Sequence, residues 1–168
     1  MRTLRERFGR PLRLAVVGGG PGAWIGDMHR SAAQLDGHWQ VVAGVFSSDP
    51  ERSRAAGMAL GMAPERAYGD VAQMIACERD RADAVDAVSI MTPNDTHHSY
   101  AAAALDAGFD VVGDKPVAHD FAQACDLLQR TRKGGRLFAV AHGYSAYPMT
   151  RYARHLVREG VLGDVRLV

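Results

Sequence analysis

A glycine-rich segment near the start of the chain constrains the fold more than any other feature. Residues 18–23 read Gly-Gly-Gly-Pro-Gly-Ala and directly follow the apolar run of residues 12–17. A helical pattern comes next, so the segment is predicted to turn a strand tightly into the start of a helix. Glycines there let the backbone approach a ligand, and the free N–H groups of a helix start suit a pyrophosphate. The segment predicts dinucleotide binding, with a plain glycine turn as the alternative.

Three residues of this segment fit the dinucleotide fingerprint G-x-G-x-x-[GA], namely Gly18, Gly20 and Ala23. Trp24, which follows, is interpreted as a core or rim residue rather than a stacking platform. The cofactor contacts predicted for the segment are Gly18, Gly20, Gly22, Ala23, Trp24 and Ile25.

Short apolar runs alternate with helical patterns along the rest of the chain. The runs are rich in Val, Ile, Leu, Phe and Ala, which is typical of strands buried on both faces of a sheet. Such alternation predicts an α/β Rossmann fold, a doubly wound parallel sheet with right-handed crossovers. The predicted strands are residues 12–17, 40–46, 84–91, 109–113 and 136–141. The predicted helices are residues 24–35, 50–61, 70–78, 96–107 and 119–133.

Composition excludes several functional classes. The 168 residues suit one ordinary domain, and a net charge of +1 gives no field that would attract nucleic acid. No apolar run is long enough to span a bilayer, so no membrane partner is expected. Cys77 and Cys125 lack metal-ligand spacing, so no metal site is predicted; we interpret them as buried, reduced thiols of a cytoplasmic protein.

The cations of the chain are unevenly divided, with eighteen arginines and two lysines. Lys133 lies before Gly134 and Gly135, at a predicted helix end where any cation suits the helix dipole. Lys115 has no such explanation. In a chain that uses arginine almost everywhere, it indicates a position where arginine would not serve.

The end of the chain predicts a second structural unit. Residues 148–160 have a helical pattern, and residues 163–168 begin an alternating strand. We therefore expect a fragment of a longer protein. Residues 1–143 would form the dinucleotide-binding domain, and residues 144–168 the connecting helix and first strand of a C-terminal α+β substrate domain.

Several motifs occur together in the second half of the chain. Residues 89–97 read Ser-Ile-Met-Thr-Pro-Asn-Asp-Thr-His, residues 104–108 read Ala-Leu-Asp-Ala-Gly, and residues 113–116 read Gly-Asp-Lys-Pro. In order and spacing they closely resemble the glucose–fructose oxidoreductase, inositol dehydrogenase and rhizopine-catabolism (Gfo/Idh/MocA) family. The resemblance runs from about residue 12 to the end and covers the nucleotide-binding half of that family.

The resemblance implies a catalytic role for Lys115 at the carboxyl end of a strand, beside the nicotinamide. An ammonium there can polarise a hydroxyl or carbonyl oxygen, and its pKa can shift on desolvation, which that of arginine cannot. A structural lysine in a turn before proline is the alternative. Asp114 stands where the family has Glu, with a shorter reach toward Lys115, and Pro116 completes the motif. Asp114, Lys115 and Pro116 are also predicted cofactor contacts.

Further cofactor contacts are implied for the loop formed by Thr92, Pro93 and Asn94. Its alternative role is helix capping by Asn94 or Asp95. His97 matches the family's histidine and either contacts the ligand or packs beneath the loop and orients it. Other family positions are Gly26 and His29, which fit a Gly-x-x-His pattern, and His142 and Tyr144, which either line the site or pack in the core.

The choice of cofactor depends on the end of the second predicted strand. Ser47 and Ser48 stand where an acidic residue would bind the ribose hydroxyls of NAD, and Asp49 follows only after them. The pattern favours NADP over NAD slightly, with Arg52 or Arg54 as partners of the 2′-phosphate. The alternative is that both serines merely begin a helix.

The resemblance implies an NAD(P)-dependent oxidoreductase that moves a hydride between the nicotinamide and a sugar, inositol or related polyol. The family's second domain supplies most of the substrate pocket and an oligomer interface, so the parent protein is expected to be a homo-oligomer and this chain alone nearly inactive. The alternatives are a non-catalytic nucleotide-binding or redox-sensing module, an S-adenosylmethionine-dependent methyltransferase, and an NAD-using glycosidase within the family.

Overall fold

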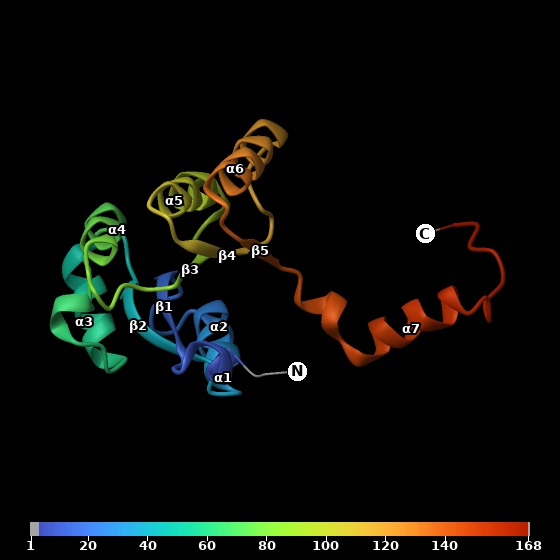
Figure 1. The fold of residues 1–168 in the computed structure, drawn as a ribbon, viewed down its shortest axis with the longest axis horizontal. Coiled ribbons are helices and arrows are strands. Elements are labelled where there is room, and N and C mark those ends of the chain that lie inside the picture. Colours follow the sequence, from blue (N-terminus) through green and yellow to red (C-terminus); the bar gives the residue numbers. More distant parts are fainter. Residues whose placement is uncertain (1–3, 168) are drawn as a thin grey trace.

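The structure is a computed structural model that describes residues 4–167 (Figure 1). Five parallel strands form one sheet in the order β2-β1-β3-β4-β5, with helices on both faces, which confirms the predicted Rossmann-like fold. The strands are β1 (Leu12–Gly18), β2 (Trp39–Val45), β3 (Ala87–Met91), β4 (Asp110–Asp114) and β5 (Phe138–Ala141). The α-helices are α1 (Leu4–Phe8), α2 (Trp24–Gln34), α3 (Pro50–Ala59), α4 (Val71–Arg79), α5 (Asn94–Asp106), α6 (Phe121–Gly134) and α7 (Pro148–Arg158). Two short 3-10 helices are η1 (Pro64–Arg66) and η2 (Gly143–Ala146).

Strand order decides which helices cover which face. The chain steps from β1 to β2 in one direction, and then from β2 through β3 and β4 to β5 in the other. Because right-handed crossovers place helices on opposite faces for opposite steps, α2 lies on one face and α4, α5 and α6 on the other. We call the α2 side the front face of the sheet.

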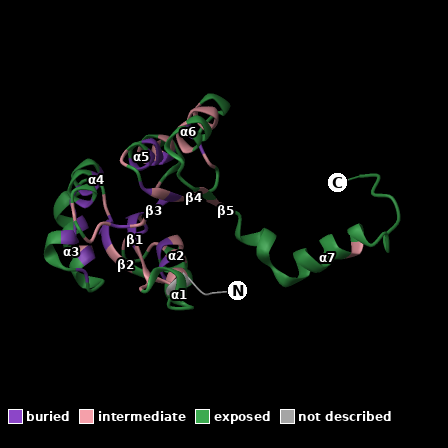
Figure 2. Cartoon of the chain, viewed as in Figure 1, coloured by how far each residue is buried: buried purple, intermediate pink, exposed green. Residues whose placement is uncertain are grey.

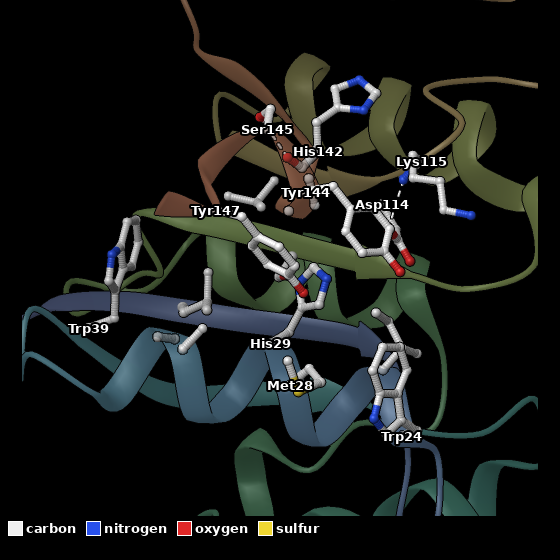
Figure 3. A pocket seen from close by; sticks show the side chains of 18 residues that line it. Trp24, Met28, His29, Trp39, Asp114, Lys115, His142, Tyr144, Ser145 and Tyr147 are labelled. Atoms are coloured by element: carbon white, nitrogen blue, oxygen red, sulfur yellow. Dashed lines mark hydrogen bonds between the residues drawn. The ribbon is translucent and has the colours of Figure 1, made fainter. Parts of the chain in front are cut away.

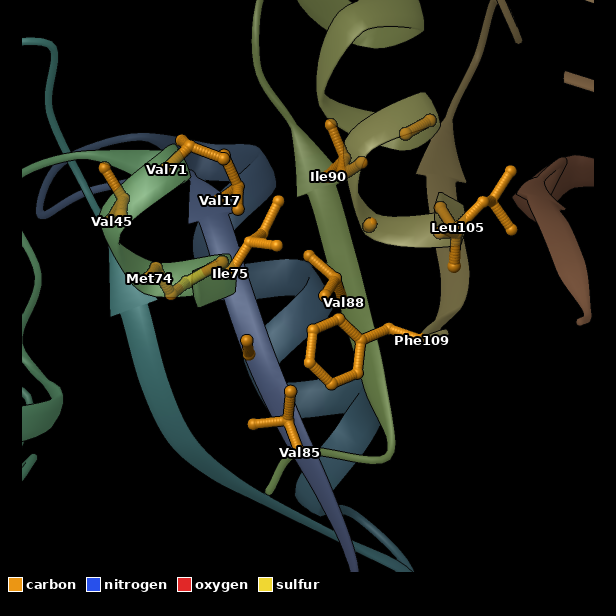
Figure 4. Packing of buried hydrophobic residues seen from close by; sticks show 14 of the residues in the cluster. Val17, Val45, Val71, Met74, Ile75, Val85, Val88, Ile90, Leu105 and Phe109 are labelled. Carbon is orange, nitrogen blue, oxygen red and sulfur yellow. The ribbon is translucent and has the colours of Figure 1, made fainter. Parts of the chain in front are cut away.

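The two faces divide the core as a parallel sheet requires. In β1, Ala15 and Val17 point to the back face, while Leu14 and Val16 point to the front. The larger cluster lies behind the sheet, where Met74 of α4 and Leu105 of α5 pack on the strands (Figure 4). β3, buried along its whole length, lies at the centre of this packing.

A buried polar cluster ties η1 to α4 at the edge of this core. Glu78 is fully buried and forms a two-point ion pair with Arg66, whose side chain is 7% exposed. The hydroxyl of Tyr68 donates to the same carboxylate at 2.9 Å. Burial and the bond to Glu78 raise the pKa of Tyr68 far above its usual range. The carboxylate is thus surrounded by donors in place of water.

The C-terminal segment leaves the body of the molecule. The α7 helix projects away from the sheet and has no buried residue (Figures 1 and 2). Residues 163–167 pair with no strand in the described part of the chain. A strand needs a neighbour to satisfy its hydrogen bonds, so the strand expected at residues 163–168 as part of a second domain stays a prediction. No helix in the described part of the chain has both the length and the apolar character to cross a membrane.

The two cysteines are free, as expected, but the prediction that both are buried is wrong. Cys77 is exposed and Cys125 is half-buried. Both lie on amphipathic back-face helices, and the residues that reach the sheet from these helices are larger apolar side chains such as Met74 and Leu127.

The buried ion pair leads to a stability prediction. Replacing Glu78→Ala removes the buried partner of the Arg66 guanidinium and leaves only its longer contact of 3.2 Å with the partly exposed Asp83. We expect a loss of about 3 kcal/mol in the free energy of unfolding. Urea denaturation followed by circular dichroism measures it. Arg79→Ala removes the neighbouring exposed pair with Asp80 (side chains 58% and 73% exposed) and should change stability little. Equal effects of the two variants would contradict a structural role for the buried pair.

Candidate functional site

The predicted site residues meet at one edge of the sheet. All five strands are parallel, so the loops after β1, β2, β3 and β4 emerge at the same carboxyl edge. The glycine loop follows β1, Ser47 and Ser48 follow β2, the Thr92 loop follows β3, and Lys115 follows β4. The strand order reverses at β1, and such a point is where open α/β sheets bind ligands.

The glycine loop approaches three other backbone segments too closely for side chains. A Cβ on Gly18 would lie 2.8 Å from the Met91 carbonyl oxygen, and one on Gly20 would lie 2.5 Å from that of Phe46. A Cβ on Gly26 would lie only 2.0 Å from the Gly19 oxygen, so Gly26 provides the close contact between α2 and the loop. Gly22 has open space around it and a φ of +84°, which suits a turn.

A buried arginine, which the sequence did not single out, holds this loop from behind. Arg30 is 8% exposed, and its guanidinium donates to the carbonyl oxygen of Gly19 and to the Asp27 carboxylate. It therefore fixes the direction of the Gly19 peptide. It also offsets the negative charge of Asp27, which lies in the first turn of α2 where an anionic ligand would bind.

Helix capping differs among the four helices that follow strands at this edge. Aspartate side chains cap α3 through Asp49 and α6 through Asp120. By contrast, α2 and α5 have no side-chain cap, and they follow the neighbouring strands β1 and β3. Within the described residues, the N–H groups of Trp24 and Ile25 have no hydrogen-bond partner. A glycine-lined cradle beside two uncapped helix starts fits the diphosphate of a dinucleotide.

Trp24 and Ile25 also differ in their side chains. Trp24 is 72% exposed at the start of α2, so it is a rim residue and not part of the core. Ile25 is half-buried against the front-face core cluster. Ile25 can therefore offer its backbone N–H to a ligand, and it also lines the cavity on the front face.

The loop after β2 offers serine hydroxyls and no free carboxylate. Asp49 accepts the Arg52 N–H at 2.8 Å and is thereby used as the cap of α3. The Ser47 hydroxyl accepts the Asp49 N–H at 3.1 Å, whereas Ser48 and Arg52 are exposed. The Arg54 guanidinium lies against Gly69, so Arg52 is the less engaged of the two arginines.

The loop after β3 presents Pro93 and Asn94 to solvent. The Thr96 hydroxyl is 2.7 Å from both the Thr92 hydroxyl and the Pro93 carbonyl, which holds the loop against the first turn of α5. The alternative that Asn94 or Asp95 caps α5 does not hold, because Pro93 occupies the cap position and no side chain caps the helix. The Asn94 amide thus remains available to a ligand.

His97 lies beneath this loop and not on the open edge. It is 4% exposed, and its ring nitrogens are 2.8 Å from the Thr92 carbonyl oxygen and 2.7 Å from the Pro116 carbonyl oxygen. Of the two roles open from sequence, the contacts match the one in which His97 orients the loop.

Lys115 and Pro116 are exposed at the end of β4 and are joined by a cis peptide bond. The Asp114 carboxylate accepts the backbone N–H of Lys115 at 2.8 Å. Within the described residues, the Lys115 ammonium has no ion pair or hydrogen bond. The short Asp114 side chain therefore contacts the backbone of Lys115 and not its ammonium.

A broad cavity of about 1400 Å³ opens on the front face beside Lys115 (Figure 3). Its walls come from α2, η2 and the front face of the five strands. Tyr144 is 77% exposed and His142 is exposed as well, so neither packs in the core. The polar and aromatic side chains that line the cavity include Trp24, His29, Ser89, Asp114, His142, Tyr144 and Tyr147.

His29 links α2 to the sheet inside this cavity. Its Nδ1 lies 3.1 Å from the hydroxyl of Ser89. Burial lowers the pKa of His29, although the negative charge of Asp114 opposes the shift. A neutral imidazole in the wall of the cavity can exchange a proton near neutral pH. The spacing of Gly26 and His29 was the available sequence signal for this residue.

Comparison with known proteins agrees with this geometry. A family model described as the oxidoreductase family GFO_IDH_MocA, with an NAD-binding Rossmann fold, matches residues 12–142. The chain is 38% identical over 160 residues to the uncharacterised oxidoreductase YfiI of Bacillus subtilis, covering 95% of this chain and 41% of that protein. D-apiose dehydrogenase of Paraburkholderia graminis is 31% identical over 124 residues, which are 74% of this chain and 31% of that enzyme.

A solved structure is similar to this chain in fold and in sequence. The inositol dehydrogenase homologue of Azotobacter vinelandii, in complex with NADH and myo-inositol, superposes with a TM-score of 0.91 at 39% identity. The match covers 94% of this chain and 41% of that one. The chain thus spans less than half the length of these relatives.

The contact between Gly19 and Gly26 can be tested by adding one methyl group. We expect Gly26→Ala to weaken dinucleotide binding at least tenfold and to destabilise the fold by about 1–3 kcal/mol, because the methyl group cannot fit against the Gly19 carbonyl. Isothermal titration calorimetry and thermal unfolding measure the two effects. Gly134→Ala, whose nearest neighbour would be 3.5 Å away, is the matched control and should change neither quantity appreciably. If Gly26→Ala binds the dinucleotide as tightly as the wild type, the close contact between Gly19 and Gly26 is not part of the binding site.

Proposed function

We propose that this chain, which belongs to the Gfo/Idh/MocA family of oxidoreductases, is the nicotinamide-dinucleotide-binding half of a dehydrogenase acting on a sugar, inositol or related polyol. One observation carries the proposal. A lysine ammonium that has no partner among the described residues stands at the end of β4, on the same edge as a glycine cradle that opens between two uncapped helix starts.

Each part of the edge then has a role in binding. The backbone of residues 18–25 and the start of α2 hold the diphosphate, with Gly18, Gly20, Gly22 and Ala23 in the loop and N–H groups from Trp24 and Ile25. Thr92, Pro93 and Asn94 contact the nicotinamide riboside from the neighbouring loop. Asp114 and Pro116 fix the backbone on either side of Lys115. Two observations support these roles: the N–H groups of Trp24 and Ile25 have no hydrogen-bond partner within the described residues, and Asn94 is exposed.

Lys115 is the residue that would act on the substrate. The nicotinamide, when bound, supplies or accepts the hydride. The ammonium donates a hydrogen bond to the oxygen on the reacting carbon and stabilises negative charge as it develops there. The cavity beside it gives the substrate a place, and its aromatic and polar side chains (Tyr144, Tyr147 and His142) suit the two faces of a sugar or cyclitol ring.

The substrate class rests on relatives. One relative of known structure is in complex with myo-inositol, and a second relative is named D-apiose dehydrogenase. Myo-inositol and D-apiose are both polyhydroxylated carbon compounds. We further propose that residues 144–168 connect to a second domain. The α7 helix supports this, because Met149, Tyr152 and Val157 are large apolar side chains exposed along it.

NADP is the cofactor that we propose over NAD. Support comes from the loop after β2, where Asp49 is occupied as a helix cap and two serine hydroxyls stand near the exposed Arg52. The hydroxyls can donate to a 2′-phosphate, and the guanidinium can pair with it. The solved relative from Azotobacter vinelandii is in complex with NADH.

Cofactor binding itself is the first test. Titration of the chain with NADPH should enhance nicotinamide fluorescence with a dissociation constant below 1 mM, an order-of-magnitude bound for a specific dinucleotide site, and NADH should bind more weakly. S-adenosylmethionine should not compete, and turnover of myo-inositol by this chain alone should be negligible. A folded sample that binds neither dinucleotide would overturn the proposal. Binding without any role for Lys115 in the longer protein would favour the non-catalytic module.

The preference for NADP can be reversed at one position. Ser48→Asp places a carboxylate where it repels the 2′-phosphate and accepts the ribose hydroxyls, so we expect the affinity ratio of NADH to NADPH to rise at least tenfold. Ser48→Ala is the matched control and should weaken NADPH only modestly. Competition titration with both cofactors gives the ratio. If the affinity ratio of NADH to NADPH does not change in Ser48→Asp, then Ser48 does not lie near the 2′-phosphate of the cofactor.

A further inference from the structure

His97 is buried, with 4% of its surface exposed, and each of its ring nitrogens faces a hydrogen-bond acceptor. Its Nδ1 lies 2.7 Å from the Pro116 carbonyl oxygen, and its Nε2 lies 2.8 Å from the Thr92 carbonyl oxygen. A carbonyl oxygen can only accept a hydrogen bond. Both ring nitrogens must therefore donate for both contacts to be favourable.

The neutral ring cannot meet that requirement. Neutral imidazole carries one N–H and one lone pair, so one of the two carbonyl oxygens would face a lone pair at hydrogen-bond distance. At 4% exposure, neither group could turn to water instead, and an unsatisfied buried polar group destabilises the protein. The imidazolium satisfies both acceptors with charge-assisted hydrogen bonds.

We propose that His97 is held in the doubly protonated form and acts as a positioning residue that clamps the Thr92 loop to the turn carrying Lys115. Thr92 begins the loop assigned above to the nicotinamide riboside, and Pro116 directly follows Lys115. One buried ring thus fixes the distance between the loop that orients the cofactor and the lysine that would contact the substrate. The clamp deepens the proposed function and rests on it for its catalytic meaning.

Several charged and titratable side chains lie on the elements that surround His97, and they bear on whether its ring carries a positive charge. The elements that meet at the ring carry Asp95 and His98 on α5, Asp114 and Lys115 at the end of β4, and His119 and Asp120 before α6. None forms an ion pair with His97 within the described residues, and His98 pairs with Asp126. The start of α5 and burial both disfavour a cation here, so the two carbonyl oxygens are what stabilise it. A bound diphosphate at the same edge would stabilise it further.

Nitrogen-15 NMR of the cofactor-free chain tests the protonation state directly. At pH 7 we expect His97 to show two protonated ring nitrogens, whereas His29, whose pKa burial lowers, should show one bare nitrogen in the same spectrum. A bare nitrogen on His97 at pH 7 would overturn the proposal. This measurement needs no cofactor, so its outcome is independent of whether the chain binds a dinucleotide.

Two variants test the clamp itself. His97→Phe keeps a ring but donates nothing, and His97→Gln can donate to one carbonyl. Amide hydrogen exchange at residues 92–96 and 117–118 should accelerate roughly tenfold in His97→Phe and less in His97→Gln, with α6 unchanged. Unchanged exchange in both segments would overturn the positioning role.

The pH dependence of binding separates the clamp from a purely structural side chain. In the wild type, loss of the proton removes one donor, so the dinucleotide dissociation constant should rise with pH through the midpoint at which NMR sees His97 titrate. His97→Gln should lose that dependence. A profile that stays the same in His97→Gln would also overturn the proposal. If the wild type binds no dinucleotide while NMR shows the doubly protonated ring, the proposed function fails and the clamp remains.

Discussion

The contact between the backbones of Gly19 and Gly26 is the constraint on which the rest of the site depends. It brings α2 so close to the loop after β1 that no side chain fits between them. As a result, the first N–H groups of α2 face the carboxyl edge of the sheet. Arg30 then fixes the Gly19 carbonyl from behind, so the loop presents N–H groups and not oxygens to an anion.

The strand order explains why the two faces of the sheet differ. With α2 as the helix packed on the front of β1 and β2, the front of β4 and β5 is left open and forms the wall of the cavity. Ser89 and Val112 point into this space from neighbouring strands, and His29 reaches it from α2. A ligand at the edge and a ligand on the front face would thus be adjacent, as a cofactor and its substrate must be.

Much of this could be predicted from the sequence, because the signals are local. The strands were predictable from buried apolar runs, and β3 illustrates this with five consecutive buried residues. The loops after β1 and β3 were predictable from Gly18, Gly20 and Pro93, whose backbone preferences act within a few residues. Strand pairing is not local: residues 163–167 have the alternation of a strand but no neighbouring strand to pair with in the described part of the chain.

What the sequence could not provide are contacts across the fold. Arg30 was one of many arginines, and only the fold brings its guanidinium back to Gly19. The role of His97 depends on two carbonyl groups, one of them nineteen residues away along the chain. Glu78 and Arg66 are likewise ordinary surface residues by type, and their burial follows from how η1 packs against α4.

The positions of Asp114 and Lys115 explain why a chain rich in arginine has lysine here. The shorter aspartate binds the backbone N–H of Lys115, and the ammonium has no partner among residues 4–167. A guanidinium at this position would stay charged at any working pH and would spread its donors over a planar fork. An ammonium presents a compact charge that can share its proton with one oxygen. The carboxylate therefore fixes the main chain, His97 fixes the following carbonyl, and the side chain alone is left free to meet a substrate.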